Sequence, residues 1–340
     1  MSVSQDDKMV ENAKTATSTS WIDCVLHRDR NPLDNEASAW IGFDVANSCY
    51  ATVSLATFLP LVLNSYATTQ AWVASGRDKP PMCGDITNYA VSCIECRVGE
   101  GDLLCTGPGT GRTNCIDLDT PNLSGGINPT SFAFLIISLS CISQLIAFMF
   151  FSETADHTDN RKGLLMTSSL VGSLSIILFA FFPESEGSAK YILAALITII
   201  SNTAFGMAQV YYNAYLPLIS EDLLDKTNDS DSDSKSKFGE TLDDIENTLS
   251  SYALAGGYWA GVIGLILSII VLMLSGGMAK DATEYEISSS FRWAIVLSGF
   301  WWFFGTLCTI PRFQQRPNIP KPFEWLGSIK KFKKTISNTY

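Results

Sequence analysis

The sequence predicts an all-α membrane protein with six transmembrane helices, on two observations. Six long stretches hold no charged residue, and each reaches the roughly 20 residues that cross a bilayer as a helix. The charged residues are concentrated between these stretches. Backbone amides in lipid must bond within their own segment, which a helix achieves. The six stretches are Val45–Gly76, Thr120–Ser152, Gly163–Pro183, Tyr191–Ser220, Asn247–Ala279 and Trp293–Pro311.

The charge distribution predicts how these helices are oriented. Residues 312–340 carry seven basic residues against one acidic residue, and a basic block beside a span favours the cytoplasmic side. No secretory signal precedes the first span, and six spans place the N-terminus in the cytoplasm too. We therefore expect a cytoplasmic, largely disordered tail over 1–39, the six-helix bundle over 40–311 and a basic cytoplasmic tail over 312–340.

The two longest predicted loops differ in composition. Loop 221–246 holds ten acidic residues and faces the cytoplasm. Its low complexity is typical of a solvated, disordered linker, and its serines beside acidic residues also suit phosphorylation by an acid-directed kinase. Loop 65–129 faces the non-cytoplasmic side and holds five of the nine cysteines of the chain.

The cysteines of loop 65–129 predict disulfides, because they gather on the oxidising side of the membrane. Because five is an odd number, one of these cysteines either remains a free thiol or pairs with a cysteine of a partner. Cys93 and Cys96 form a CxxC, which also occurs in redox centres and zinc sites, but no second CxxC and no nearby histidine accompany it. Asn122 begins a glycosylation sequon on the same side. The disulfide candidates are Cys83, Cys93, Cys96, Cys105 and Cys115.

No motif of an enzyme occurs in the chain: there is no nucleotide-binding P-loop, GxSxG or HExxH, and no histidine within a span. We expect no catalysis, no cofactor, no metal and no nucleic-acid partner. Polar residues inside spans are better indicators of function, because they are costly in lipid.

The first polar group lies where the first span begins. Asp44, Asn47 and Ser48 recur at i, i+3 and i+4, so they share one side of a helix. This side can bind a proton, a substrate amine or another helix, or Asp44 can cap or pair locally at the membrane boundary. Both interpretations stay open.

Three further features lie in or near the fourth, fifth and sixth spans. Gln209 and Asn213 are four residues apart on one helix face, where their amides can bond between helices or line a pathway. Gly257 and Gly261 form a GxxxG pattern, which lets two helices approach closely. Arg292, at the start of the sixth span, can bind a carboxylate or snorkel to the interface.

Three motifs at these positions resemble one known family. They are Trp40-Ile-Gly-Phe-Asp-Val-Ala-Asn-Ser-Cys-Tyr50, Tyr212-Asn-Ala-Tyr-Leu-Pro217 and Ser251-Tyr-Ala-Leu-Ala-Gly-Gly-Tyr258 with Gly261. The chain is similar in these motifs to the fungal autophagy-related protein 22 family, the vacuolar amino-acid effluxers of the major facilitator superfamily. The resemblance covers residues 40–311. It implies a six-transmembrane-helix half of a major-facilitator-type bundle with a cysteine-rich lumenal loop.

The superfamily also has a signature in the cytoplasmic loop after the second span, a Gly, an Asp and then Gly-Arg-Arg/Lys. Asp156, Arg161 and Lys162 match this signature, while Ser152 replaces the first Gly and the Asp-to-Arg spacing is one residue longer. The resemblance implies that this loop is a gating latch between helices.

The resemblance further implies a function. It is the export of amino acids from the vacuole after autophagic breakdown, by alternating access around a site between two six-helix halves. The expected partners are amino acids as substrate, the lipid bilayer, and a second six-helix half or a second copy of the chain. One alternative is a membrane adaptor that does not transport and binds partners through its cytoplasmic loops. Another is a redox protein that uses Cys93 and Cys96.

Overall fold

The computed structural model describes residues 32–75, 98–99, 102–103, 122–123, 126–157, 160–182, 189–230, 241–279 and 284–315. Nearly all of the described residues are helical. The helices are α3 Pro32–Cys49, η1 Tyr50–Phe58, α4 Leu59–Ser75, α5 Pro129–His157, α6 Arg161–Ile177, η2 Leu178–Phe181, α7 Ala189–Asn213, α8 Leu216–Ser230, α9 Leu242–Leu274, α10 Glu284–Thr309 and η4 Ile310–Arg312. The strands β1 Val98–Gly99 and β2 Asp102–Leu103 form one short antiparallel pair.

The structure confirms the predicted fold class. Within the described residues, six helices are long and apolar enough to cross a membrane. They match the six charge-free stretches one for one, although most extend beyond them. These six are Asn35–Ser75, Pro129–Phe151, Arg161–Phe181, Lys190–Lys226, Leu242–Leu274 and Glu286–Arg312.

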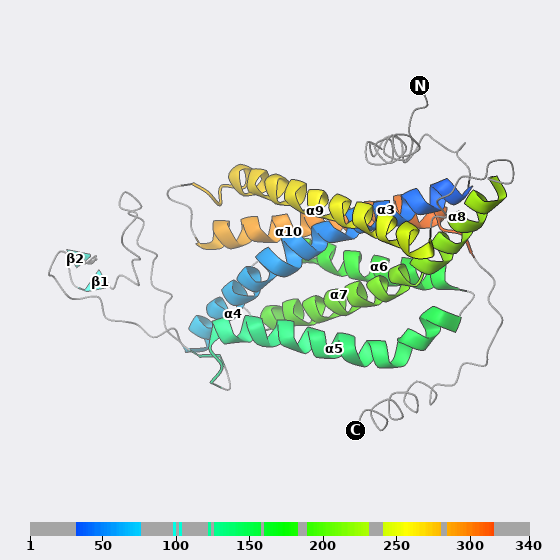
Figure 1. Ribbon diagram of the computed structural model, residues 1–340. Coiled ribbons are helices and arrows are strands. Elements are labelled where there is room, and N and C mark those ends of the chain that lie inside the picture. The colour runs from blue at the N-terminus through cyan, green and yellow to red at the C-terminus, as the bar shows by residue number, and fades with distance from the viewer. Residues whose placement is uncertain are drawn as a thin grey trace.

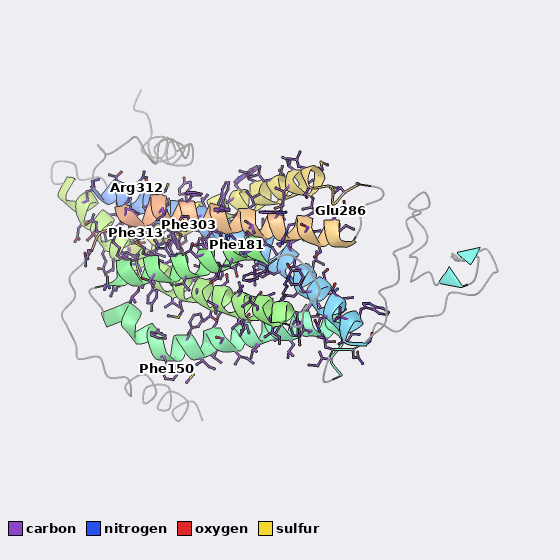
Figure 2. The ribbon with its side chains drawn as sticks, turned by 180° about the vertical axis from the view of Figure 1, so that it is seen from behind. Phe150, Phe181, Glu286, Phe303, Arg312 and Phe313 are labelled. Atoms are coloured by element: carbon purple, nitrogen blue, oxygen red, sulfur yellow. The ribbon has the colours of Figure 1, made fainter. Side chains whose placement is uncertain are left out.

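The six spans lie side by side in one bundle (Figure 1). The first span, α3 continuing through η1 into α4, crosses the bundle diagonally, while α9 and α5 lie at opposite edges (Figures 1 and 2). Helix α3 packs on α9 and α10, and α7 packs on α5 and α6. Helices α5 and α9 also expose many large apolar side chains, among them Phe134 and Ile142 on α5 and Trp259 and Ile266 on α9.

The middle of the first span is a π-helix, which hydropathy did not predict. The Leu59 N–H bonds to the carbonyl of Ser54, and the Thr57 hydroxyl donates to the carbonyl of Thr52 at 2.8 Å. Pro60 follows directly. Proline has no N–H, and in an α-helix its ring would clash with the carbonyl four residues earlier. The wider winding before Pro60 avoids this clash.

Several segments that the sequence predicted as loops or tails are partly helical in the structure. The N-terminal tail was expected to reach residue 39, but α3 begins at Pro32, and α4 extends to Ser75, into the predicted loop 65–129. In the acidic loop 221–246, residues up to Ser230 belong to α8 and residues from Leu242 belong to α9.

The start of α9 explains why the acidic loop is shorter than expected. Thr241 and Asp244 form a capping box, in which the Thr241 Oγ1 accepts from the Asp244 N–H and the Asp244 carboxylate accepts from the Thr241 N–H. Two orphan backbone donors are satisfied in this way, so the acidic residues stabilise a helix start.

An aromatic group joins four spans at the centre of the bundle. The Tyr50 ring lies 4.8 Å from the Trp302 ring of α10 and 5.2 Å from the Phe205 ring of α7, measured between centroids. The Ser201 hydroxyl of α7 donates to the Tyr50 hydroxyl at 3.1 Å. A side chain at Gly172 of α6 would overlap the Trp302 ring. Glycine at this position therefore makes room for the tryptophan.

Candidate functional site

The contact between α3 and α9 holds the half-buried carboxylate of Asp44. Ser48, one turn later, donates to Asp44 Oδ2 at 3.5 Å. Both side chains lie against Gly257, where any Cβ atom would overlap Asp44 Oδ2 and Ser48 Oγ. The missing side chain of Gly257 thus provides the space that Asp44 and Ser48 fill.

Two more glycines continue this contact along α9. A Cβ atom at Gly261 would lie 2.7 Å from the Thr52 hydroxyl, and one at Gly264 would lie 2.6 Å from Cys49 Sγ. We call Gly257, Gly261 and Gly264 the glycine stripe. Its partners on the first span are mainly polar or small. The contact between the first and fifth spans is therefore lined by one carboxylate, two hydroxyls and one thiol. A carboxylate in this setting can accept a proton or bind a cation.

The structure separates Asn47 from Asp44 and Ser48. Asn47 shares a side of the first span with Trp40, Phe43 and Tyr50, at spacings of seven, four and three residues. These three aromatic side chains contact residues of α7. Asn47 itself is fully buried, and its amide nitrogen and oxygen have no hydrogen-bond partner among the residues that the structure describes.

The other two predicted pathway residues lie on a third surface. Gln209 is half-buried, and Asn213, the last residue of α7, is exposed. On α7 they follow Asn202 and Gly206 at helical spacing, and Gly206 lies against Gln144 of α5. The interactions of the described residues thus do not bring the four predicted pathway residues together, since Asp44 bonds to Ser48, Asn47 is buried without a hydrogen-bond partner in the described part, and Asn213 is exposed.

Helices α5 and α7 are joined by hydrogen bonds between polar side chains within the spans. Gln144 Nε2 donates to the Asn202 backbone carbonyl at 2.6 Å and to Asn202 Oδ1 at 2.9 Å. The Asn202 amide donates to Ser140 Oγ at 2.6 Å. Interhelical bonds of this kind hold transmembrane helices together.

Trp40 and Tyr212, from two of the three sequence motifs, pack on each other. Their rings are stacked at 4.5 Å with an interplanar angle of 8°. Trp40 Nε1 also donates to the Tyr212 backbone carbonyl at 3.1 Å. The two motifs are 172 residues apart in the chain and meet in one contact between α3 and the end of α7.

The predicted gating residue Lys162 contacts the end of the sixth span. Its ammonium group donates to the carbonyls of Pro311 and Phe313, both at 2.8 Å. A cation satisfies the orphan carbonyls at a helix C-terminus and suits the negative end of the helix dipole. Arg161 is the first residue of α6, and Asp156 belongs to α5, but the side chain of Asp156 lies outside the described part.

Sequence reasoning missed a second contact at this end of the bundle. Glu36 is fully buried, and its Oε1 accepts from the backbone N–H of Gln314 at 3.0 Å. Figure 2 shows the neighbouring Phe313 at the end of the bundle opposite Glu286. The signal was present, since Glu36 precedes Trp40 and Phe43 at helical spacing, in line with the buried side of α3.

The predicted sites of covalent modification lie mostly outside the described residues. This holds for the five cysteines of the lumenal loop, so their disulfides remain predictions. Asn122 is described and exposed. Its glycosylation also remains a prediction.

A sequence-family model described as "Vacuole effluxer Atg22 like" matches residues 34–339. The chain belongs to the Atg22-like vacuole effluxer family. The resemblance drawn from the three motifs is thereby confirmed.

Curated relatives agree with membership in the Atg22-like family. Autophagy-related protein 22-1 of Phaeosphaeria nodorum is 28% identical over 304 residues, which cover 85% of this chain and 49% of that protein. Autophagy-related protein 22-2 of Neosartorya fischeri is 27% identical over 329 residues, which cover 84% of this chain and 50% of that protein. The chain thus spans about half the length of these relatives. No solved structure matches it.

Proposed function

We propose that this chain forms a six-helix half of a vacuolar membrane transporter that exports amino acids released by autophagic degradation. The family description and the names of the relatives support a vacuolar effluxer that acts in autophagy. Six candidate spans in a chain that matches about half the length of its relatives support a two-half protein of the major-facilitator type. In this proposal, the N-terminal and C-terminal ends of the six-helix bundle both lie in the cytoplasm, as the charge pattern indicates.

The observation that carries the proposal is the carboxylate of Asp44, half-buried against the glycine stripe within a membrane span. Ionisable residues inside membrane spans are costly, and they mark substrate and proton pathways. The mechanism we propose is alternating access, with Asp44 as the group that binds the substrate amine or the coupling proton.

Substitution of Asp44 tests this role. Vacuoles isolated from cells that express Asp44→Asn are loaded with radiolabelled amino acids, and the initial rate of efflux is compared with wild type. Asparagine keeps the size of the side chain and removes its charge. Because hydrogen bonds to charged groups contribute about 1.5–3 kcal/mol, we expect efflux to be about tenfold slower or more.

Asp243→Asn is the matched control, since Asp243 is exposed in the first turn of α9. It should transport like wild type. Unchanged efflux in Asp44→Asn would remove Asp44 from the pathway. Equal efflux from vacuoles with and without the protein would instead favour the adaptor that does not transport.

A further inference from the structure

Arg292 is a buried cation near the start of α10. Its side chain is only 6% exposed. Arg292 follows Glu286 by six residues, and Figure 2 shows Glu286 at one end of the bundle. A snorkelling arginine would instead extend its guanidinium into water, so the burial argues against the snorkelling interpretation.

The guanidinium of Arg292 is only partly satisfied. Its Nη2 donates to Ser289 Oγ at 3.1 Å, and its central carbon lies 5.4 Å from the centroid of the Trp293 ring. Its Nε and Nη1 have no hydrogen-bond partner in the described part of the chain. Removing a charge from water carries a large free-energy penalty, which an opposite charge in good geometry can offset.

A second unsatisfied group lies one turn before the arginine. Ser288 is 3% exposed, and its hydroxyl also has no partner among the described residues. Ser288 and Arg292 lie four residues apart, on one side of α10. Gly299 continues this side and lies against Ile176 and Ile177 near the end of α6. The two polar side chains therefore lie on the side of α10 that is turned toward α6 and η2.

The nearest described carboxylate along α10 does not fit as a partner. Glu286 is exposed, and the spacing of six residues places it on a different side of the helix from Arg292. The buried group thus carries one positive charge, free N–H donors on both edges of a planar guanidinium, and a hydroxyl. This donor set matches a planar monoanion, which a guanidinium binds through two parallel hydrogen bonds.

We propose that Arg292 and Ser288 form a binding site for the carboxylate of a small ligand, between the start of α10 and η2. The two carboxylate oxygens accept from one edge of the guanidinium, that is, from the second N–H of Nη2 together with Nε or Nη1, and the Ser288 hydroxyl donates to one of them. This assignment concerns binding alone and does not depend on the transport proposal.

Thermal unfolding in the presence of acetate tests this site. The purified protein in lipid nanodiscs is heated at increasing sodium acetate, with sodium chloride added to keep the ionic strength constant. A ligand that binds only the folded state raises the unfolding midpoint. We expect acetate to raise the wild-type midpoint, and Arg292→Gln to weaken the apparent affinity about tenfold or more, because two charge-assisted hydrogen bonds are lost.

Three variants serve as controls. Arg292→Lys keeps the charge without the fork, and should bind acetate more weakly than wild type but better than Arg292→Gln. Ser288→Ala should weaken binding while it leaves the guanidinium in place, and it provides a readout if Arg292→Gln does not fold. Lys190→Gln removes another cation, near the start of α7, and should respond to acetate like wild type.

Two results would overturn the site. One is an equal acetate response in wild type and Arg292→Gln, which would indicate a general salt effect. The other is a wild-type midpoint that does not respond to acetate. If Arg292→Gln is then also less stable than wild type, the partner of Arg292 is an acidic side chain of the chain itself.

Discussion

Side-chain size along α9 determines how closely the first span can approach. Gly257, Gly261 and Gly264 each face a side chain of α3 or η1 at a distance that leaves no room for a Cβ atom. The GxxxG pattern predicted such a contact, but it could not show that Asp44 and Ser48 occupy the space. At the residue scale, the packing role of Gly257 and the polar role of Asp44 are therefore linked.

A larger residue at Gly257 should separate the two helices. We expect Gly257→Val to destabilise the protein by about 1–3 kcal/mol, because its side chain would overlap Asp44 and Ser48. The midpoint of thermal unfolding in nanodiscs measures this change. Ala255→Val, at an exposed position of the same helix, is the matched control and should unfold like wild type. Equal midpoints for the two variants would contradict the close contact.

At the scale of single elements, the π-helical segment of the first span determines which side chains face α10. The hydroxyl oxygens of Ser54 in η1 and Ser298 in α10 lie 2.5 Å apart, and the Ser54 hydroxyl also lies 3.5 Å from the carbonyl of Ile295. Uninterrupted α-helical winding from Tyr50 onward would rotate Ser54 relative to this contact.

A pair of cysteines can test the winding of η1. In Ser54→Cys/Ser298→Cys, we expect a disulfide to form on mild oxidation, since the two side chains already touch. The shift in mobility on a non-reducing gel measures it. Ser54→Cys/Ser288→Cys places the second thiol almost three helical turns away on α10, and should not crosslink. Efficient crosslinking of both pairs would mean that the assay does not report this geometry.

A second element-scale feature is the attachment of the sixth span to the third. Lys162 donates to two carbonyls at the end of α10 and η4. We expect Lys162→Met to lower the free energy of unfolding by about 1 kcal/mol, because two backbone acceptors lose their donor. Lys162→Arg, which keeps the charge and the donors, should be closer to wild type. Denaturant unfolding measures both, and a fully stable Lys162→Met would show that the contact contributes little.

At the scale of the whole molecule, the number of spans was predictable because each is a long stretch without charge. The helix ends were not, because local hydrogen bonding determines them. The capping box at Thr241 and Asp244 starts α9 among acidic residues that were interpreted as a linker. Helix α8 was missed for the same reason, although Leu216, Ile219 and Leu223 recur at helical spacing and pack in the core.

The candidate site was only partly predictable. The sequence identified Asp44 as a costly polar residue where the first span begins, but periodicity alone could not show that Asn47 is fully buried and has no hydrogen-bond partner in the described part of the chain. Glu36 and Arg292 were passed over or left open, because a charged residue at the end of a span is usually exposed, whereas neighbouring helices bury both of these. Burial by other elements is a tertiary property, and a single sequence does not contain it directly.

The most direct test of the account is transport by the purified protein. Liposomes that contain the reconstituted protein are loaded with a mixture of radiolabelled amino acids, and release is measured against liposomes without protein. The account predicts release that requires the protein and is lost in Asp44→Asn but not in Asp243→Asn. Release no faster than from protein-free liposomes would contradict the proposal that copies of this bundle together form a working amino-acid effluxer.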